Sequence, residues 1–298
     1  MIELATRDAQ LATSLFWYNA LVKIGFHLPI SKGFAWTHHE ATRLGCEVVQ
    51  IFVKNPRSWG EKILSDESRE DFLRLFHDLP VVAHLSYLPN LARIDEDQRH
   101  LKAIFHEAML CTQLGIDTLI MHCGSRKQRK RGMANIAEGV DRVLAAFGIS
   151  VMLENAAGQG DSLGTSIPEL GEIYHRISAK SRVSLCLDTA HIFEAGYNVR
   201  SRLVWKRILR EARDHLGSEA LGFFHLNDSK TPLGSKVDRH WHIGQGEIGL
   251  SAFRYLLNEQ KFAHLGGVME TPKMGNMDDV NMKTMRSLLS PLVSGSLS

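Results

Sequence analysis

Short, continuously apolar runs alternate along this chain with longer stretches in which apolar residues recur at helical spacing. Because these runs are apolar throughout rather than at every second position, they are typical of parallel strands that are covered on both faces. Eight such runs predict strands at Ile24–Leu28, Val48–Val53, Val81–Leu85, Thr118–Met121, Val151–Glu154, Val183–Asp188, Leu221–Leu226 and Gly266–Glu270.

The stretches between the runs have the pattern of amphipathic helices, with apolar residues on one face and charged residues on the other. They predict eight helices at Trp36–Leu44, Ser68–His77, Gln98–Leu114, Met133–Phe147, Ile167–Arg176, Ser201–Leu216, Leu250–Asn258 and Asp278–Leu289. Strands and helices alternate with no linker and no break in composition. This order predicts an α/β fold, a single (β/α)8 TIM barrel with its active site at the C-terminal ends of the strands.

Length and composition agree with one barrel domain and exclude several other classes of protein. We expect residues 23–298 to form the barrel and residues 1–22 to be an N-terminal extension, one helix without an assigned function. A formal charge of +2 does not by itself indicate a nucleic-acid partner, so any such signal must be local. No apolar run approaches the roughly 20 residues of a membrane span.

Cysteine usage and the N-terminal sequence bear on the compartment. The four cysteines lie far apart and form no CxxC pair, which indicates free thiols in a reducing compartment. No secretory signal with a cleavage pattern is evident. We therefore expect an intracellular, cytoplasmic protein that has no membrane partner.

The predicted strands share one chemical feature: six in succession end in a residue able to bind a metal. These residues are His84, His122, Glu154, Asp188, His225 and Glu270. Any one of them is explained as well by an ordinary hydrogen-bonded histidine or an ion-paired carboxylate. In a parallel barrel, however, all the strand ends open on one face. Three carboxylates buried there would need protonation or metal ions, so the pattern favours a metal site.

Three further candidate ligands lie in the loops on the same face. His191 follows the sixth strand, and Asp238 and His240 flank Arg239 in the loop after the seventh strand. Imidazole and carboxylate groups are the ligands that zinc favours. Nine candidate ligands are too many for one ion, whereas three ions would fit if one carboxylate bridges two of them.

Several longer motifs now show a resemblance that covers the chain from about Ile24 to Glu270. In order they are Lys54-Asn55-Pro56-Arg57-Ser58-Trp59, His84-Leu85-Ser86-Tyr87-Leu88, Leu153-Glu154-Asn155-Ala156-Ala157-Gly158-Gln159-Gly160, Leu187-Asp188-Thr189-Ala190-His191, Ala195-Gly196-Tyr197, His225-Leu226-Asn227-Asp228, Val237-Asp238-Arg239-His240 and Met269-Glu270-Thr271. On these motifs the chain resembles the endonuclease IV family, the zinc-dependent apurinic/apyrimidinic (AP) endonucleases of base excision repair.

The resemblance implies three zinc ions and assigns a ligand set to each; it leaves open whether manganese replaces zinc at one site. The first ion would be held by His84, His122 and Glu154, and Glu154 would bridge it to the second. The second ion would also be held by Asp188, His225 and Glu270, and the third by His191, Asp238 and His240. Glu154 and Glu270 would be catalytic, the second by orienting the attacking water.

The implied reaction is hydrolysis of the phosphodiester bond 5′ to an abasic site in duplex DNA, which leaves a 3′-hydroxyl. Phosphodiesterase or phosphatase activity on 3′-blocked ends is implied as well, by a monomeric enzyme.

DNA contacts are expected from the loops around the same face. By the resemblance, Arg57 and Tyr87 would enter the DNA at the lesion. The basic run at residues 126–131 follows the fourth strand, and although such runs are usually solvated, this position favours phosphate contact. The expected DNA-binding residues are Arg57, Tyr87, Arg126, Lys127, Arg129 and Arg239.

The chain departs from the family pattern at two places. The family usually shows His-Pro-Gly-Ser-His after the fourth strand, where this chain has His122-Cys123-Gly124-Ser125-Arg126, and it tends to have Asp at the position of Leu85. Neither departure removes a predicted ligand, but both affect the expected contacts with DNA.

Two other functions remain open from the sequence. A metal-dependent sugar isomerase or epimerase of the xylose-isomerase-like barrels also carries Glu, Asp and His at strand ends. It would not need His191, Asp238 and His240 as a third ligand set, nor a basic loop at the rim. A metal-holding DNA-binding module without activity would be indicated by a missing ligand, and all nine positions are filled.

Overall fold

The computed structural model describes residues 22–217 and 220–289. The predicted N-terminal extension therefore lies outside the described residues, except for Val22, which is buried in the core next to the first strand. No helix in the described part of the chain is long and apolar enough to cross a membrane.

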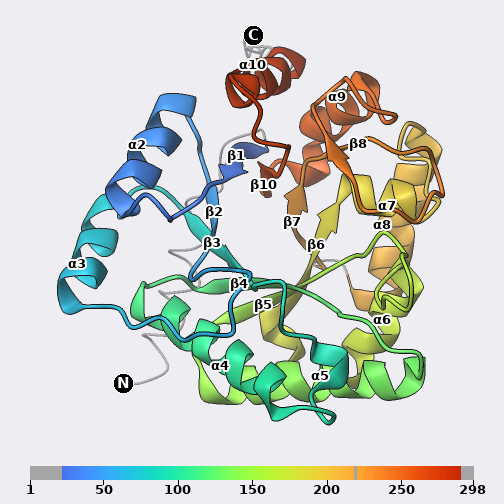
Figure 1. The fold of residues 1–298 in the computed structure, drawn as a ribbon. Helices are drawn as coiled ribbons and strands as arrows, with labels where there is room; N and C mark the ends of the chain where they lie inside the picture. Colours follow the sequence, from blue (N-terminus) through green and yellow to red (C-terminus); the bar gives the residue numbers. More distant parts are fainter. Residues whose placement is uncertain (1–21, 218–219, 290–298) are drawn as a thin grey trace, which may run out of the picture.

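Eight parallel strands close into a barrel, and the helices lie outside it (Figure 1). Around the barrel the strands follow the order β1-β10-β7-β6-β5-β4-β3-β2, so β1 and β10 close the ring. The predicted (β/α)8 barrel is confirmed. The barrel strands are β1 (Lys23–His27), β2 (Val49–Phe52), β3 (Val81–His84), β4 (Thr118–His122), β5 (Ser150–Glu154), β6 (Val183–Asp188), β7 (Leu221–His225) and β10 (Gly266–Met269).

The helices agree with the predicted ones to within a few residues, with one addition. They are α2 (Phe34–Leu44), α3 (Asp66–Leu75), α4 (Gln98–Gln113), α5 (Arg129–Ala146), α6 (Ile167–Arg176), α7 (Thr189–Glu194), α8 (Arg202–Leu216), α9 (Leu250–Asn258) and α10 (Met277–Leu288). Short 3-10 turns occur at Leu91–Arg93, Lys180–Arg182 and Gln260–Phe262. The additional helix, α7, follows β6 directly.

Local sequence signals explain where several of these helices begin and end. The Ser166 hydroxyl accepts the backbone N–H of Glu169, whose carboxylate in turn accepts the N–H groups of Gly164 and Thr165, so α6 begins at a reciprocal cap. Helix α2 ends at Gly45, whose φ of 68° lies in the left-handed region. The two ends of α5 carry no such signal, and this helix starts four residues earlier than its apolar pattern predicts.

The hydrophobic core has two parts. The larger part lies between the strands and the surrounding helices. A small cluster fills the inside of the barrel and contains Val48, Ile120, Cys186, Phe223 and Val268. Both faces of each strand are therefore covered by apolar groups, and the polar ends of the strands are confined to the mouth of the barrel.

The long loop after β7 carries a small hairpin of its own. Strand β8 (Asp228–Ser229) pairs antiparallel with β9 (His240–Trp241), which brings His240 back over the barrel mouth. The Asp228 carboxylate accepts backbone N–H groups from Ser229, Gly244 and Ile248 and so holds both ends of this loop together.

Candidate metal centre

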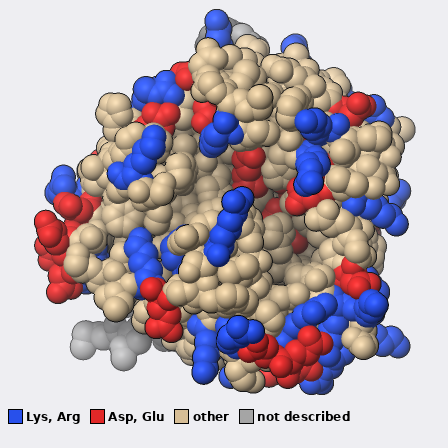
Figure 2. Space-filling model, in the orientation of Figure 1, with Lys and Arg blue, Asp and Glu red and all other residues tan. Residues whose placement is uncertain are grey.

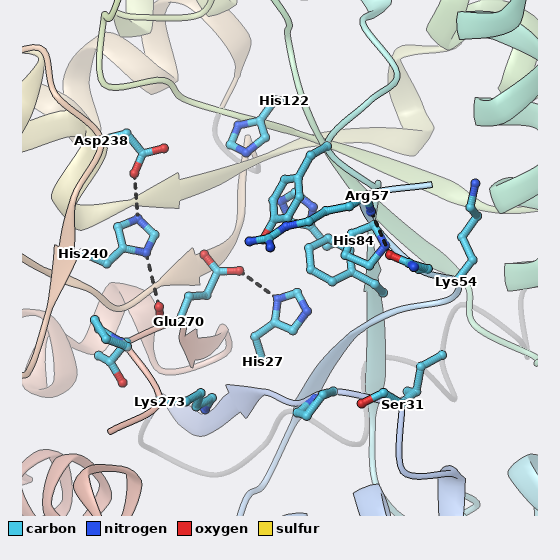
Figure 3. Close-up of a pocket in the computed structure, with 18 of the residues that line it drawn as sticks. His27, Ser31, Lys54, Arg57, His84, His122, Asp238, His240, Glu270 and Lys273 are labelled. Atoms are coloured by element: carbon cyan, nitrogen blue, oxygen red, sulfur yellow. Dashed lines mark hydrogen bonds and ion pairs between the residues drawn. The ribbon is translucent and has the colours of Figure 1, made fainter. Parts of the chain in front are cut away.

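All nine predicted ligands lie together at the mouth of the barrel. Figure 2 shows Asp and Glu atoms inside a hollow near the centre of this face, with Lys and Arg side chains around its edge. The hollow is a cavity of about 980 Å³ whose lining includes six of the nine, namely His84, His122, His191, Asp238, His240 and Glu270. In Figure 3 the labelled side chains of different strands point into this shared space.

The first predicted ligand set meets at one oxygen of Glu154. The Nε2 atom of His84 lies 2.9 Å from Glu154 Oε2, and the Nδ1 atom of His122 lies 3.3 Å from the same oxygen. Glu154 and His84 are buried, whereas the His122 side chain is 40% exposed.

The second predicted set surrounds the other oxygen of Glu154. His225 Nδ1 lies 2.9 Å from Glu154 Oε1, 3.4 Å from Glu270 Oε2 and 3.8 Å from Asp188 Oδ2. One carboxylate therefore faces two groups of donors, as a bridging ligand must.

The third predicted set forms a compact triangle. His191 Nε2 lies 3.3 Å from Asp238 Oδ1 and 3.3 Å from His240 Nε2, and His240 Nε2 lies 3.6 Å from Asp238 Oδ1. Asp238 is the most open ligand of this set, because its side chain is 39% exposed.

These spacings fit divalent ions. Two ligands of a tetrahedral zinc ion, each about 2.0–2.1 Å from the metal, lie about 3.3 Å apart. Several donor pairs in all three sets have separations near this value. The donors are imidazole nitrogens and carboxylate oxygens, which suit zinc. Eight of the nine, all but Asp238, fall into four overlapping groups whose ligand atoms lie within 4.8 Å of one another.

Helix α7 explains how Asp188 and His191 come to face the same point. One oxygen of Asp188 accepts the backbone N–H groups of Ala190 and His191 and caps the helix. The other oxygen remains directed at the site, 3.3 Å from His240 Nε2. The short helix, which the apolar pattern did not predict, thus exists because a predicted ligand also serves as its cap.

Two asparagines, Asn155 and Asn227, form hydrogen bonds with the predicted ligands from outside the cavity. Asn155 accepts the N–H of Asp188 at 2.7 Å, and its backbone carbonyl lies 3.0 Å from His191 Nδ1. Asn227 donates to Asp188 Oδ2 at 2.8 Å and accepts the N–H of Glu270 at 2.8 Å. Such outer contacts orient metal ligands.

The charges at the site depend on one another. Burial alone would raise the pKa of Glu154, but the neighbouring imidazoles, His122 and His225 first among them, hold it well below its usual range. Burial lowers the pKa of His240, but the charge of Asp188 more than offsets this and raises it to about 9. Positive charge nearby therefore keeps the Glu154 carboxylate ionised, and divalent ions would supply such charge without protonating the imidazoles.

The sequence reasoning missed two contributors from the first two strands. His27, at the end of β1, places Nδ1 2.9 Å from Glu270 Oε1, as Figure 3 shows. Gln50, inside β2, donates to the same oxygen at 2.7 Å. His27 was visible as a polar residue at a strand end, like the six predicted residues. Gln50 was visible as the one polar residue in the run Val48–Val53, but it lies within the strand and not at its end.

Two predicted DNA contacts lie at the rim of the cavity. Arg57 is exposed and lines the cavity, and Tyr87 is 58% exposed beside it. A hydrogen bond of 3.1 Å from the Tyr87 N–H to the Pro56 carbonyl joins their two loops. Their role in DNA binding stays a prediction, but both side chains are free to meet a ligand at the mouth.

The basic run is largely engaged within the protein. Arg126 is only 11% exposed and pairs with Asp95 at 2.5 Å and with Glu96 at 3.2 Å. Arg129 pairs with Glu169. Arg126 therefore has little surface left for a phosphate contact, whereas the Arg129 side chain remains 45% exposed beside its partner. Within the described ranges no ion pair occupies Lys127, which is exposed.

The remaining predictions near the mouth have mixed outcomes. Arg239 is exposed, with its guanidinium donating to the Asp238 carbonyl at 2.9 Å. Cys123 is buried, packs against Gly164 and does not line the cavity, and burial raises the pKa of its thiol.

Comparisons with known proteins agree with this site. Residues 39–290 match the family described as "Xylose isomerase-like TIM barrel". A relative from Chloroflexus aggregans (strain MD-66 / DSM 9485), named "Probable endonuclease 4", is 38% identical over 280 residues, which are 90% of this chain and 98% of the relative.

Among solved structures, sequence identity distinguishes members of the same family from proteins that share only the fold. The crystal structure of endonuclease IV from Thermus thermophilus has a TM-score of 0.78 and 33% identity, and the match covers 89% of this chain and 98% of that one. A D-tagatose 3-epimerase-like protein has a TM-score of 0.65 over 89% of this chain and 96% of its own, but at 16% identity this likeness shows the fold alone. The chain belongs to the endonuclease 4 family of xylose isomerase-like TIM barrels.

Proposed function

We propose that this protein is a metal-dependent AP endonuclease that hydrolyses the phosphodiester bond 5′ to abasic sites in duplex DNA and leaves a 3′-hydroxyl. Its family membership supplies the class, a DNA-cleaving hydrolase of base excision repair. The observation that carries the proposal is the Glu154 carboxylate, whose two oxygens face two different groups of imidazole and carboxylate donors, several of which line one open cavity.

We assign three zinc ions to the three ligand sets. The shared carboxylate of Glu154 would join the first two, and the triangle of His191, Asp238 and His240 would hold the third. When bound, divalent ions supply a nucleophile near neutral pH and neutralise charge on the attacking and leaving oxygens of a phosphodiester.

The protein's own groups would orient the reaction. Glu270 is held on Oε1 by His27 and Gln50, so its Oε2 is left to orient the attacking water. Arg57 and Tyr87 stand at the rim, where they would fill the gap beside an abasic sugar. Extrusion of that sugar costs little because no base pair is lost.

The test is incubation of the purified protein with duplex DNA that contains one tetrahydrofuran abasic analogue. We expect a single incision on the 5′ side that leaves a 3′-hydroxyl, and loss of activity on chelation with recovery on adding zinc. Glu154→Gln should abolish incision, whereas the matched change Glu138→Gln, at an exposed site on α5, should not.

Two outcomes would overturn the proposal. One is DNA left intact by metal-loaded protein. The other is turnover of a free ketose by the same preparation, which would restore the sugar epimerase alternative. Metal analysis of the freshly prepared protein tests the zinc assignment separately, with about three ions per chain expected.

A further inference from the structure

One buried amide lies directly behind the second ligand set. Gln50 has no exposed surface, and its side chain contacts two of the predicted ligands as well as His27. Its Oε1 lies 2.8 Å from His225 Nε2, and its Nε2 lies 2.7 Å from Glu270 Oε1 and 2.8 Å from His27 Nδ1.

The orientation of this amide follows from the hydrogen-bonding capacity of its neighbours. An ionised carboxylate only accepts hydrogen bonds, so the NH2 group of Gln50 must face Glu270. The amide oxygen therefore faces His225, and His225 Nε2 must donate a proton to it. The reverse orientation would place two acceptor oxygens in contact inside a buried site.

That requirement selects the tautomer of His225. A neutral imidazole carries one N–H, so a proton on Nε2 leaves the lone pair on Nδ1. Nδ1 is the atom that lies 2.9 Å from Glu154 Oε1 and 3.4 Å from Glu270 Oε2. The same amide holds Oε1 of Glu270 and leaves Oε2 directed into the second ligand set.

The alternative, that Gln50 only packs in the hydrophobic core, explains its contacts less well. Below Gln50 the inside of the barrel is filled by an apolar cluster that includes Val48 and Val268. Burying an amide among them is costly unless its hydrogen bonds are made. In Gln50 those bonds go to two predicted ligands, His225 and Glu270, and His27 lies beside it across β1 and β2.

We propose that Gln50 is a positioning residue of the metal centre, which fixes the Nε2–H tautomer of His225 and the orientation of Glu270 for the ion held between them. This inference rests on the metal site of the proposed function and adds a determinant of metal affinity on a strand that supplies no ligand. Loss of an outer-shell partner of this kind typically lowers metal affinity about 10–100-fold.

The experiment compares the unmodified protein with Gln50→Leu, which keeps the volume and removes both hydrogen-bonding groups. Zinc affinity is measured by competition with a chromogenic chelator, and the visible absorption of the cobalt-substituted protein reports the ligand geometry. We expect one ion to bind about 10–100-fold more weakly in Gln50→Leu, with a changed cobalt spectrum. The kcat for incision should fall while KM for DNA is unchanged.

A matched control separates positioning from general stability. Asn135 is a buried amide on α5 that donates to the Ala92 carbonyl, away from the ligands. Asn135→Ala should lower the thermal midpoint and leave zinc affinity and the cobalt spectrum unchanged. If Gln50→Leu does not fold, Gln50→Glu, which places a carboxylate oxygen against Glu270, is measured in the same way with the same expected weakening.

The possible outcomes distinguish failure of the role of Gln50 from failure of the proposed metal centre. A folded Gln50 variant with unchanged zinc affinity and an unchanged cobalt spectrum would overturn the role of Gln50 and leave the metal centre standing. Unmodified protein that binds no zinc or cobalt at all would instead remove the proposed metal centre, and the role of Gln50 with it.

Discussion

The loops that carry Arg57 and Tyr87 are anchored to helix α4 by a buried carboxylate. Glu107 has no exposed surface; its Oε2 accepts the backbone N–H of Ser86 at 2.9 Å, and its Oε1 accepts the Ser86 hydroxyl. Tyr87 follows Ser86, so the position of its ring depends on this anchor. We predict that Glu107→Ala weakens DNA binding without touching the metal ligands.

The expected loss of stability in Glu107→Ala follows from the hydrogen bonds with Ser86 that are lost. Each of the two hydrogen bonds contributes about 1–2 kcal/mol, and a buried Ser86 N–H left without a partner adds a penalty of similar size. We expect the free energy of unfolding to fall by about 3–6 kcal/mol. Displacement of Tyr87 should raise KM for abasic DNA by about tenfold, which corresponds to about 1.4 kcal/mol of binding.

The assay is steady-state incision of duplex DNA with one abasic analogue, together with urea unfolding and metal analysis. Glu107→Gln is the conservative control, because its oxygen can accept the Ser86 N–H while its amide donates to the Ser86 hydroxyl, which can rotate. We expect Glu107→Gln to restore KM, and both variants to keep the metal content and kcat of the unmodified protein.

Comparison of these variants across pH provides a second measurement. Burial raises the pKa of Glu107, although the hydrogen bonds from Ser86 oppose the shift. A carboxyl group whose folded pKa is raised contributes stability that is complete below its unfolded pKa of about 4.3 and is lost as pH rises through the folded value. The unmodified protein should therefore lose stability relative to Glu107→Gln as pH rises above about 4.3.

Either of two results would refute the predicted role of Glu107. One is an unchanged KM in a folded Glu107→Ala protein, which would mean that the Tyr87 loop does not need its anchor. The other is a stability gap over Glu107→Gln that widens in favour of the unmodified protein as pH rises.

Three further predictions follow from the surface ion pairs, the loop after β7 and the metal centre. Lys127→Ala should lower the slope of log affinity for DNA against log salt by about one and leave the thermal midpoint unchanged. Arg126→Ala, which loses the ion pair with Asp95, should lower the thermal midpoint and leave the slope unchanged. Equal slopes in the unmodified protein and both variants would contradict this prediction. Gly246→Ala should cost about 1–3 kcal/mol in urea unfolding, because a Cβ there would lie 2.4 Å from the Ser229 carbonyl oxygen. Chelation should lower the thermal midpoint, and free zinc at 100 times its Kd should restore about 2.7 kcal/mol; identical melting curves with and without zinc would exclude a bound ion.

The amino-acid sequence by itself determined the barrel and the identity of most of the site. Continuous apolar runs separated by amphipathic stretches leave few arrangements other than a parallel barrel, and the carboxyl ends of parallel strands are equivalent positions in space. A histidine or carboxylate at each of six successive strand ends therefore predicts a shared site, although Asp188 and Glu270 lie 82 positions apart in the chain.

Only the tertiary structure decided which polar groups meet. Arg126 pairs with Asp95 across 31 positions, and Gln50 contacts His225 across 175, while neither pair shares an element or a motif. Periodicity encodes which face of an element is buried, but the partner of a single polar side chain depends on distances that are set when all eight strands close. For that reason the candidate ligands could be identified from the sequence, whereas the residues that orient them, and the ion pairs of Arg126 and Arg129, could not.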